Sequence, residues 1–368
     1  MRPRPERVDR LPQQYFMALL SRVAAAAAED GVPLIDLGRG NPEVGPPPHV
    51  VEALASSAAR PDVHGYAPFR GLPELKEAVA ARYRDVYGVA LDPRREVAVV
   101  PGTKTALMEF AAVTVERGET ILLPDPGYPD YFSAVALAGA RAASFDGFDG
   151  PGAAALYLNF PSNPTAAAVP DGFFAEAVAW AERTRTWILH DLAYGDLVFD
   201  GRAPASFLAA DGARDVGIEL FSMSKTYGMA GWRLGFVVGN AELVARIELV
   251  QDHVFGGIFR PVQEAGIAAL TGSQDSVEDR RAAYERRRDR ALAALAGVEA
   301  QSEGTFFVWF RLPDGVTVER LLDEQRVAVA PGEGFGARGA GWARLSLAVT
   351  DEALETGLQR LAGASVSL

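Results

Sequence analysis

The stretch Ser222-Met-Ser-Lys225-Thr-Tyr-Gly-Met-Ala-Gly-Trp-Arg233 contains one of only three lysines in the chain, whereas 33 of the 36 basic residues are arginine. Arginine serves equally well as a solvating charge, but its guanidinium never deprotonates and so cannot form a Schiff base. A lysine retained beside two serines, with an arginine eight residues later, indicates covalent chemistry on a phosphorylated carbonyl cofactor. The alternative is a surface lysine in a polar loop, and this stretch alone leaves both open.

Length and composition exclude several classes of protein. A chain of 368 residues is long enough for more than one domain. A formal charge of −12 argues against nucleic-acid and anionic-membrane partners. The absence of cysteine excludes disulfides, thiolate metal sites and cysteine nucleophiles, and the four histidines lack metal-ligand spacing. Because no apolar run approaches membrane-spanning length, we predict a soluble, cytoplasmic protein without a metal site.

Apolar runs alternate with helical patterns, which predicts an α/β sheet. The runs are almost continuously hydrophobic, as in strands that are covered on both faces. We predict strands at Glu96–Val100, Thr120–Leu123, Arg141–Phe145, Ala155–Leu158, Trp187–Leu189, Gly217–Phe221 and Leu234–Val238, with helices that include Thr103–Glu116, Gly172–Arg183 and Glu242–Asp252.

After this region the pattern changes to a smaller α+β unit. A charged helix over Ser276–Ala296 has acids interleaved with its arginines, so we interpret it as a solvated connector. The elements expected after it are a strand at Thr305–Arg311, a helix at Val318–Gln325, a strand at Trp342–Ala348 and a helix at Asp351–Leu361. The predicted domains are a large cofactor-binding domain over 46–275 and a small domain over 276–368, which an N-terminal arm over 1–45 partly completes.

Polar residues follow several of the predicted strands. Gly102-Thr103-Lys104 lies between a strand and a helix, where backbone N–H groups favour a phosphate, although any such turn accepts these residues. Tyr128, in a proline-rich turn, offers a ring that can stack on a planar heterocycle, or it is only a turn residue.

Two further motifs also stand at strand ends. Asn163 precedes Pro164, a common turn former whose amide could also donate to a phenolate oxygen. Asp191, in Asp191-Leu-Ala-Tyr194, could keep a pyridine nitrogen protonated; the alternative is a helix N-cap. Open α/β sheets bind ligands at this edge, so the joint order of these residues indicates one site.

With Asn163-Pro-Thr, Asp191-x-x-Tyr194 and Ser222-x-Ser-Lys225 followed by Arg233, the chain resembles the class I/II aminotransferases of fold type I, which use pyridoxal 5′-phosphate. The resemblance extends from about Leu11 to Leu361. It implies a large domain with a mostly parallel sheet between helices, plus a smaller α+β domain.

The resemblance also implies roles for single residues. Lys225 would carry the cofactor as a Schiff base and shuttle the proton, Asp191 would pair with the ring nitrogen, and Tyr128 would stack on the ring. Asn163 and Tyr194 would bond the phenolic oxygen. The residues that would hold the phosphate are Thr103, Lys104, Ser222, Ser224 and Arg233, with Tyr66 from a second subunit of a homodimer.

Substrate residues follow from the same resemblance. Arg344, in Trp342-Ala-Arg344-Leu-Ser, matches the arginine that forks the α-carboxylate, a task that suits guanidinium geometry. Gly40 matches a glycine whose backbone approaches the substrate, beside Asn163. Arg260 aligns with a segment of LL-diaminopimelate aminotransferases that sends a polar residue to the neighbouring subunit's substrate. It would favour a distal carboxylate, as in glutamate or 2-oxoglutarate; the alternative is a structural arginine at a helix start.

Closer likenesses exist within the family. The segments His64–Gly71, Pro124–Tyr131 and Leu249–His253 are similar to the aminotransferases that re-form methionine in methylthioadenosine salvage, and the LL- and N-acetyl-diaminopimelate aminotransferases are nearly as similar. Ala166 departs from the family by replacing a glycine. The segment 146–154 is also short, without the helix that relatives insert near the substrate entrance.

The function expected from the sequence is transfer of an amino group from an L-amino acid to a 2-oxo acid by a ping-pong mechanism. One alternative is a carbon–sulfur lyase, or another α-amino-acid enzyme, on the same fold. The other is a non-catalytic transcriptional regulator, but such proteins carry a winged-helix domain ahead of the pattern that begins here near Leu11. The sequence names neither the donor nor the acceptor.

Overall fold

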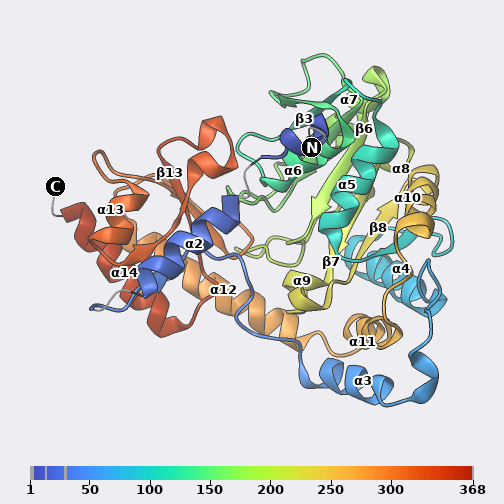
Figure 1. Ribbon diagram of the computed structural model, residues 1–368, viewed down its shortest axis with the longest axis horizontal. Helices are drawn as coiled ribbons and strands as arrows, with labels where there is room; N and C mark the ends of the chain where they lie inside the picture. The colour runs from blue at the N-terminus through green and yellow to red at the C-terminus, as the bar shows by residue number, and fades with distance from the viewer. Residues whose placement is uncertain (1–3, 13–14, 29–30, 367–368) are drawn as a thin grey trace.

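A seven-stranded sheet forms the larger part of the molecule in the computed structural model, which describes residues 4–12, 15–28 and 31–366. The strand order is β2-β8-β7-β6-β5-β3-β4, and β8 alone runs antiparallel to its neighbours (Figure 1). The strands are β2 (Val97–Val100), β3 (Thr120–Leu123), β4 (Arg141–Ser144), β5 (Ala155–Asn159), β6 (Trp187–Leu192), β7 (Gly217–Ser222) and β8 (Gly235–Gly239). The α/β prediction is confirmed, and each predicted strand is present with bounds shifted by at most a few residues.

Alternate residues of these strands face two different apolar cores, because successive side chains of a strand point to opposite faces. Val99, Leu156 and Ile188 face the core that α4 (Pro73–Tyr87), α7 (Phe173–Thr184), α8 (Ala213–Val216) and α11 (Arg260–Thr271) cover. Val100 and Tyr157 face the core beneath α5 (Thr103–Thr114), α6 (Asp130–Ala138) and α10 (Ala241–Val254). Burial on both faces explains the largely apolar sequences of β2, β5, β6, β7 and β8. The edge strand β4 differs, because all four of its residues are exposed.

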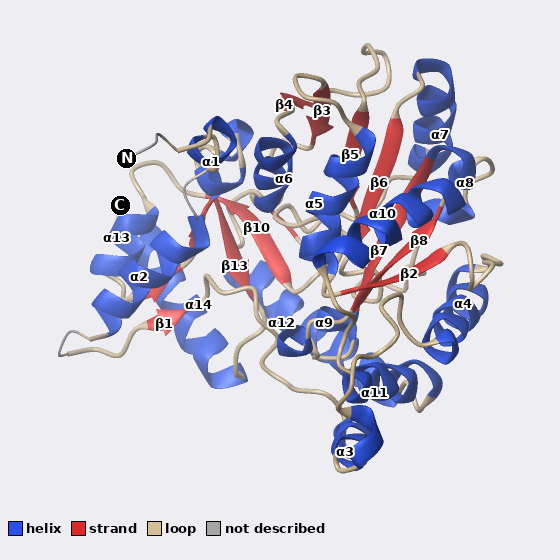
Figure 2. Ribbon diagram, turned by 45° about the vertical axis from the view of Figure 1, so that its right-hand side comes forward, coloured by secondary structure: helices blue, strands red, loops and turns tan. Residues whose placement is uncertain are grey.

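α3 (Pro48–Ala58) packs on α11 at the outside of the large part. The C-terminal elements surround a smaller antiparallel sheet of order β12-β13-β10-β9. Its strands are β9 (Ala300–Gln301), β10 (Phe307–Arg311), β12 (Ala330–Pro331) and β13 (Trp342–Ser346), and the helices beside it are α12 (Asp275–Ala294), α13 (Val318–Asp323) and α14 (Asp351–Val366). In Figure 2 this sheet lies beside the large one, with α12 between the two groups of elements.

Residues near the N-terminus contact both parts. α1 (Glu6–Asp9) lies beside α6, where Arg10 donates to the carbonyl of Ala140 at 3.0 Å. α2 (Tyr15–Ala27) packs Val23 and Ala26 against the region of α13 and β11 (Val327–Ala328). β1 (Ile35–Asp36) then pairs in parallel with β11. Residues 1–3, 13–14 and 29–30 of the predicted arm lie outside the described residues.

The interpretation of the charged helix as a solvated connector is wrong for one of its faces. On α12 the side chains of Val277, Arg280, Tyr284, Arg287 and Arg288 are buried. The three buried arginines are accommodated because acids and carbonyl groups from distant segments form ion pairs and hydrogen bonds with them, as a buried charge requires. Among the helices within residues 4–12, 15–28 and 31–366, none is long and apolar enough to cross a membrane.

Candidate active site

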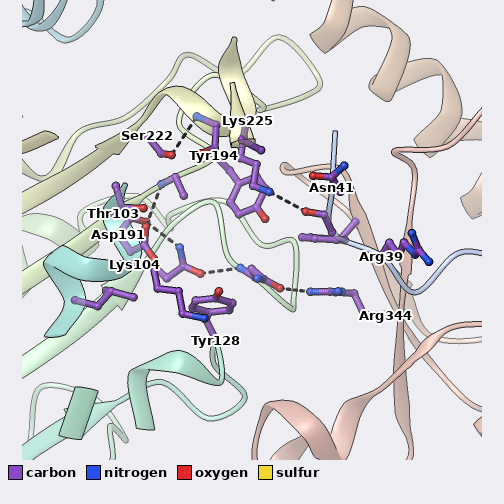
Figure 3. A pocket seen from close by; sticks show the side chains of 18 of the residues that line it. Arg39, Asn41, Thr103, Lys104, Tyr128, Asp191, Tyr194, Ser222, Lys225 and Arg344 are labelled. Carbon is purple, nitrogen blue, oxygen red and sulfur yellow. Dashed lines mark hydrogen bonds between the residues drawn. The ribbon is translucent and has the colours of Figure 1, made fainter. Parts of the chain in front are cut away.

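A cavity of about 520 Å³ opens at the carboxyl ends of β5, β6 and β7, a size typical of small-molecule sites (Figure 3). Strands of the large sheet, the loop after β1, and β10 and β13 of the small sheet all contribute to its wall. The sequence-predicted residues that line it are Gly40, Thr103, Lys104, Tyr128, Asn163, Asp191, Tyr194, Ser222, Ser224, Lys225, Arg233 and Arg344.

One end of the cavity is suited to an anion. Gly102 precedes α5 with φ +85°, and a Cβ on it would collide with the Arg233 guanidinium. Thr103 and Lys104 occupy the first turn of α5, where backbone N–H groups have no intrahelical partner. Ser222 stands at the start of the short helix α9 (Met223–Thr226) and accepts from the Ser224 N–H at 3.2 Å. N–H groups, hydroxyls and a guanidinium around one glycine fit the phosphate of pyridoxal phosphate.

Asp191 lies deeper in the cavity and belongs to β6, so the helix N-cap alternative is wrong. Its Oδ2 accepts from the Tyr131 hydroxyl at 2.9 Å, and its Oδ1 from the Ala193 N–H at 3.2 Å. Burial raises the pKa of Asp191, and the Tyr131 hydrogen bond opposes this by stabilising the carboxylate. A carboxylate fixed by neutral donors fits a protonated ring nitrogen. Tyr128 meets the Tyr131 ring edge-on at 5.6 Å.

Lys225 enters the cavity from α9. Its Nζ donates to the carbonyl of Gly40 at 2.7 Å and lies 5.9 Å from the centre of the Tyr194 ring. Burial, with the charges of Arg344 and Arg233, lowers the pKa of Lys225 to about 8. A lowered pKa increases the fraction of neutral amine near neutral pH, and the neutral amine is the nucleophile.

Arg344 projects from β13 and is 1% exposed. Its Nη1 donates to the Asn163 side-chain oxygen at 2.6 Å and its Nη2 to the Gly38 carbonyl at 3.1 Å. The guanidinium carbon lies 3.8 Å from the centre of the Phe307 ring. Stacking and neutral acceptors orient the guanidinium into the cavity, where a carboxylate could accept a charge-assisted pair of hydrogen bonds.

Two predicted site residues lie outside this cavity. Tyr66 is 90% exposed at the surface. Arg260, the first residue of α11, pairs with Glu264 at 2.7 Å, and Arg60 donates to the same carboxyl at 2.7 Å. These arginines, after the opposing effect of burial, lower the pKa of Glu264 to about 2. Both residues were expected to act from a second subunit, so their roles stay predictions.

The two departures from the family pattern have structural correlates. Ala166 has φ 56°, a left-handed conformation that glycine adopts without steric cost, which explains the family's preference there. Its side chain packs in the core of the smaller part rather than in the cavity. The short segment 146–154 contains no helix, and Asp146 pairs with Arg338 at 2.5 Å.

Several residues that line the cavity, or support a residue that lines it, were missed from the sequence. Tyr131, which bonds Asp191, was quoted only as part of a turn, although it lies three residues after Tyr128. Asp36, Arg39 and Asn41 line the cavity because the loop after β1 folds into it. Further lining residues are Val23, Gly38, Leu107, Asn159, Ala193, Ala230 and Phe307. Apart from the motif around Gly40, no local pattern marks the N-terminal residues, since their place depends on contacts with distant strands.

Known proteins similar to the chain agree with this geometry. The family model for aminotransferase class I and II matches residues 32–361. The L-glutamine–4-(methylsulfanyl)-2-oxobutanoate aminotransferase of Bacillus subtilis is 42% identical over 95% of this chain and 94% of its own length. An LL-diaminopimelate aminotransferase of Moorella thermoacetica is 36% identical over 96% of each chain. The apo structure of BacF from Bacillus subtilis superposes with a TM-score of 0.94 at 36% identity, over 99% of both chains.

The likenesses inferred from the motifs, to methionine-salvage and LL-diaminopimelate aminotransferases, are therefore confirmed. Coverage of nearly the whole chain, together with a cavity that fits the family's cofactor, leaves one assignment. The chain belongs to the class I and II aminotransferases and is a pyridoxal 5′-phosphate-dependent aminotransferase.

Proposed function

We propose that this aminotransferase moves an amino group between an L-amino acid and a 2-oxo acid in two ping-pong half-reactions, with Lys225, Asp191 and Arg344 in the central roles. The observation that carries the proposal is their convergence: a lysine with a pKa of about 8, a buried carboxylate and a buried guanidinium share one cavity. Perturbed groups that meet in a cleft are typical of catalytic sites.

Bound pyridoxal phosphate supplies an aldehyde carbon and an electron-withdrawing ring. Lys225 would hold the cofactor covalently, and its free amine would move the proton at the substrate Cα. Asp191, whose carboxylate Tyr131 orients, would keep the ring nitrogen protonated. Tyr128 would stack on the ring, and Asn163 and Tyr194 would donate to its phenolic oxygen.

The charged groups of substrate and cofactor have separate partners. Arg344 binds the substrate α-carboxylate, and the Gly40 backbone lies beside it. Thr103, Lys104, Ser222, Ser224 and Arg233 would hold the phosphate. Arg260 of a second subunit would read a distal carboxylate, although its pairing with Glu264 also suits a structural role.

We further propose a homodimer in which the partner's Tyr66 completes the phosphate site. Exposed apolar side chains gather near Tyr66: the His64 and Phe259 rings are 5.9 Å apart, and Tyr66 meets Phe69 at 6.2 Å. Val254, at the end of α10 and shortly before Phe259 in the chain, is also exposed. Exposed apolar side chains that gather in one region are typical of protein interfaces. A cytoplasmic location remains a prediction of the sequence.

Reductive trapping of the cofactor tests the proposal, and the result is easy to assign because the chain contains only three lysines. Borohydride should fix the cofactor on Lys225 and abolish the visible absorbance of the yellow holoenzyme. Peptide mapping must then separate only three candidates: Lys225, Lys104 in the phosphate cup, and Lys76, which is paired with Glu248 at 2.6 Å. Label on Lys76 or Lys104 would contradict the assignment.

Lys225→Ala should lower transamination by several orders of magnitude, because nucleophile and proton carrier are lost together. Lys76→Arg, which preserves the charge outside the cavity, is the matched control. A panel of amino donors and 2-oxo acids then identifies the substrates. Release of ammonia and a 2-oxo acid without any acceptor would instead indicate the lyase alternative.

A further inference from the structure

The loop 38–45 touches both chemically important cations of the cavity. The Gly38 carbonyl accepts from Arg344 at 3.1 Å, and the Gly40 carbonyl accepts from Lys225 at 2.7 Å. Gly40 also lies against Phe307, because a Cβ on it would be 3.2 Å from that ring. Any displacement of the loop therefore moves two hydrogen-bond acceptors away from the groups that the proposed reaction uses.

This loop is not part of a helix or strand, so its position depends on side-chain contacts. α12 supplies them. The Tyr284 hydroxyl donates to the Glu43 carboxylate at 2.7 Å, and Arg287 pairs with the other oxygen of that carboxylate. Arg280 donates to the carbonyls of Val44 at 2.9 Å and Gly45 at 3.2 Å.

The α12 side of these contacts is buried and the Glu43 side chain is 19% exposed, whereas the loop residues Val44 and Gly45 are exposed. Tyr284 is 1% exposed and Arg287 is 9% exposed. Arg287 also donates to the carbonyl of Leu347 at 3.1 Å, just after the strand that carries Arg344, and pairs with Asp351 at 3.1 Å. One guanidinium thus joins the loop, α12, the end of β13 and the start of α14. A hydrogen-bonded pair in a water-poor setting holds geometry more firmly than a surface pair.

On the other side the loop rests on the turn that follows Lys225. A Cβ on Gly228 would lie 2.6 Å from the Val44 carbonyl and 2.9 Å from the Arg280 guanidinium. The loop is therefore held between the lysine-bearing turn and the buried face of α12.

We propose that Glu43, Tyr284 and Arg287 are positioning residues of the transamination reaction. They fix the loop 38–45 so that its carbonyls keep Arg344 and Lys225 in register for substrate. The inference rests on the roles proposed above for Lys225 and Arg344. It assigns to the charged helix a function that its composition does not suggest.

The test compares Tyr284→Phe and Glu43→Gln with Arg281→Gln, all as holoenzymes. Tyr284→Phe deletes one hydroxyl and keeps the ring. Arg281 pairs with Glu278 and Glu285 on α12 itself, so its replacement is the matched control. We expect the first two variants to raise KM for the amino donor by about tenfold with kcat changed less than about threefold, because carboxylate binding by Arg344 weakens before chemistry does. The control should match the wild type.

A double variant gives a second readout. Because Tyr284 and Glu43 act through one shared bond, Glu43→Gln combined with Tyr284→Phe should raise KM no more than the larger single effect. If both single variants kept normal KM and kcat and only their melting temperatures fell, these residues would contribute to stability and not to positioning, and the inference would be wrong. A KM shift in Arg281→Gln equal to theirs would also overturn the inference.

Different variants test the positioning role and the proposed function, so one can fail without the other. If Lys225→Ala retains transamination, the proposed function is wrong whatever the loop variants do. If Lys225 proves essential while Tyr284→Phe and Glu43→Gln keep normal KM, only the positioning role of α12 is lost.

Discussion

Replacing Asp191 with asparagine isolates the charge that faces the cofactor ring. The amide keeps the shape of the carboxylate, and its oxygen still accepts from Tyr131, which donates at 2.9 Å in the native protein. What disappears is the negative charge that balances a protonated ring nitrogen. A charge-assisted hydrogen bond contributes about 1.5–3 kcal/mol. Since each 1.36 kcal/mol corresponds to tenfold in rate, kcat should fall by about 10- to 150-fold.

The assay is a single-turnover half-reaction with an amino donor, followed by the loss of cofactor absorbance. Cofactor content should stay near one per chain, because the phosphate cup and Lys225 are intact. Tyr131→Phe, which removes only the orienting hydroxyl, should lower kcat by less. Normal kcat in Asp191→Asn would refute the assignment of this carboxylate to the ring nitrogen.

The free energy of unfolding of the same variant provides an independent test. Burial raises the pKa of Asp191 in the folded apoprotein. A raised carboxyl pKa means that folding favours the protonated form. This contribution is fully present below the unfolded pKa of about 3.9 and is lost as pH rises through the folded pKa. At pH 7, apo Asp191→Asn should therefore unfold at a denaturant concentration equal to or above that of the apo wild type. A clear destabilisation would contradict burial as the main cause.

Three further predictions concern other cavity and surface residues. Because the pKa of Lys225 is lowered to about 8, the rate at which apoprotein binds pyridoxal phosphate covalently should rise through about pH 8 and then level off; a midpoint near 10.5, the ordinary lysine value, would contradict this. Arg344→Met should raise KM for amino donors by at least about tenfold for each lost charge-assisted bond, as measured in initial-rate kinetics with cofactor content as control. Arg260→Ala should lower kcat/KM for dicarboxylic substrates by about ten- to a hundred-fold and spare methionine or aromatic ones, whereas equal effects would make Arg260 structural.

Local sequence patterns were sufficient for the strands and for much of the cavity. Apolar runs predicted β2, β5, β6, β7 and β8 because these strands are buried on both faces, whereas the predicted edge strand β4 is exposed along its length. Residues at strand ends, such as Asp191 and Ser222, came together because parallel strands bring their carboxyl ends to one edge. The rarity of lysine singled out Lys225 without any structural information.

The charged helix shows where local patterns fail. α12 has polar residues around most of its circumference, so periodicity gave no sign of a buried face. Tertiary structure buries Arg287 and Arg288 because Glu43, Asp351 and Asp200 reach them from distant segments. An interpretation based on local composition treats such arginines as solvated, because their ion-pair partners come from segments that are distant in the sequence.

The sequence by itself thus determined the α/β sheet, the order of its strand-end motifs and the family chemistry, because these depend on the periodicity and identity of neighbouring residues. Only the tertiary structure decided how the N-terminal loop enters the cavity. Its contacts join Gly40 to Lys225, 185 residues apart, and Gly38 to Arg344, 306 residues apart. Hydrogen bonds between segments so distant form only when the whole chain has packed, so no local pattern can encode them.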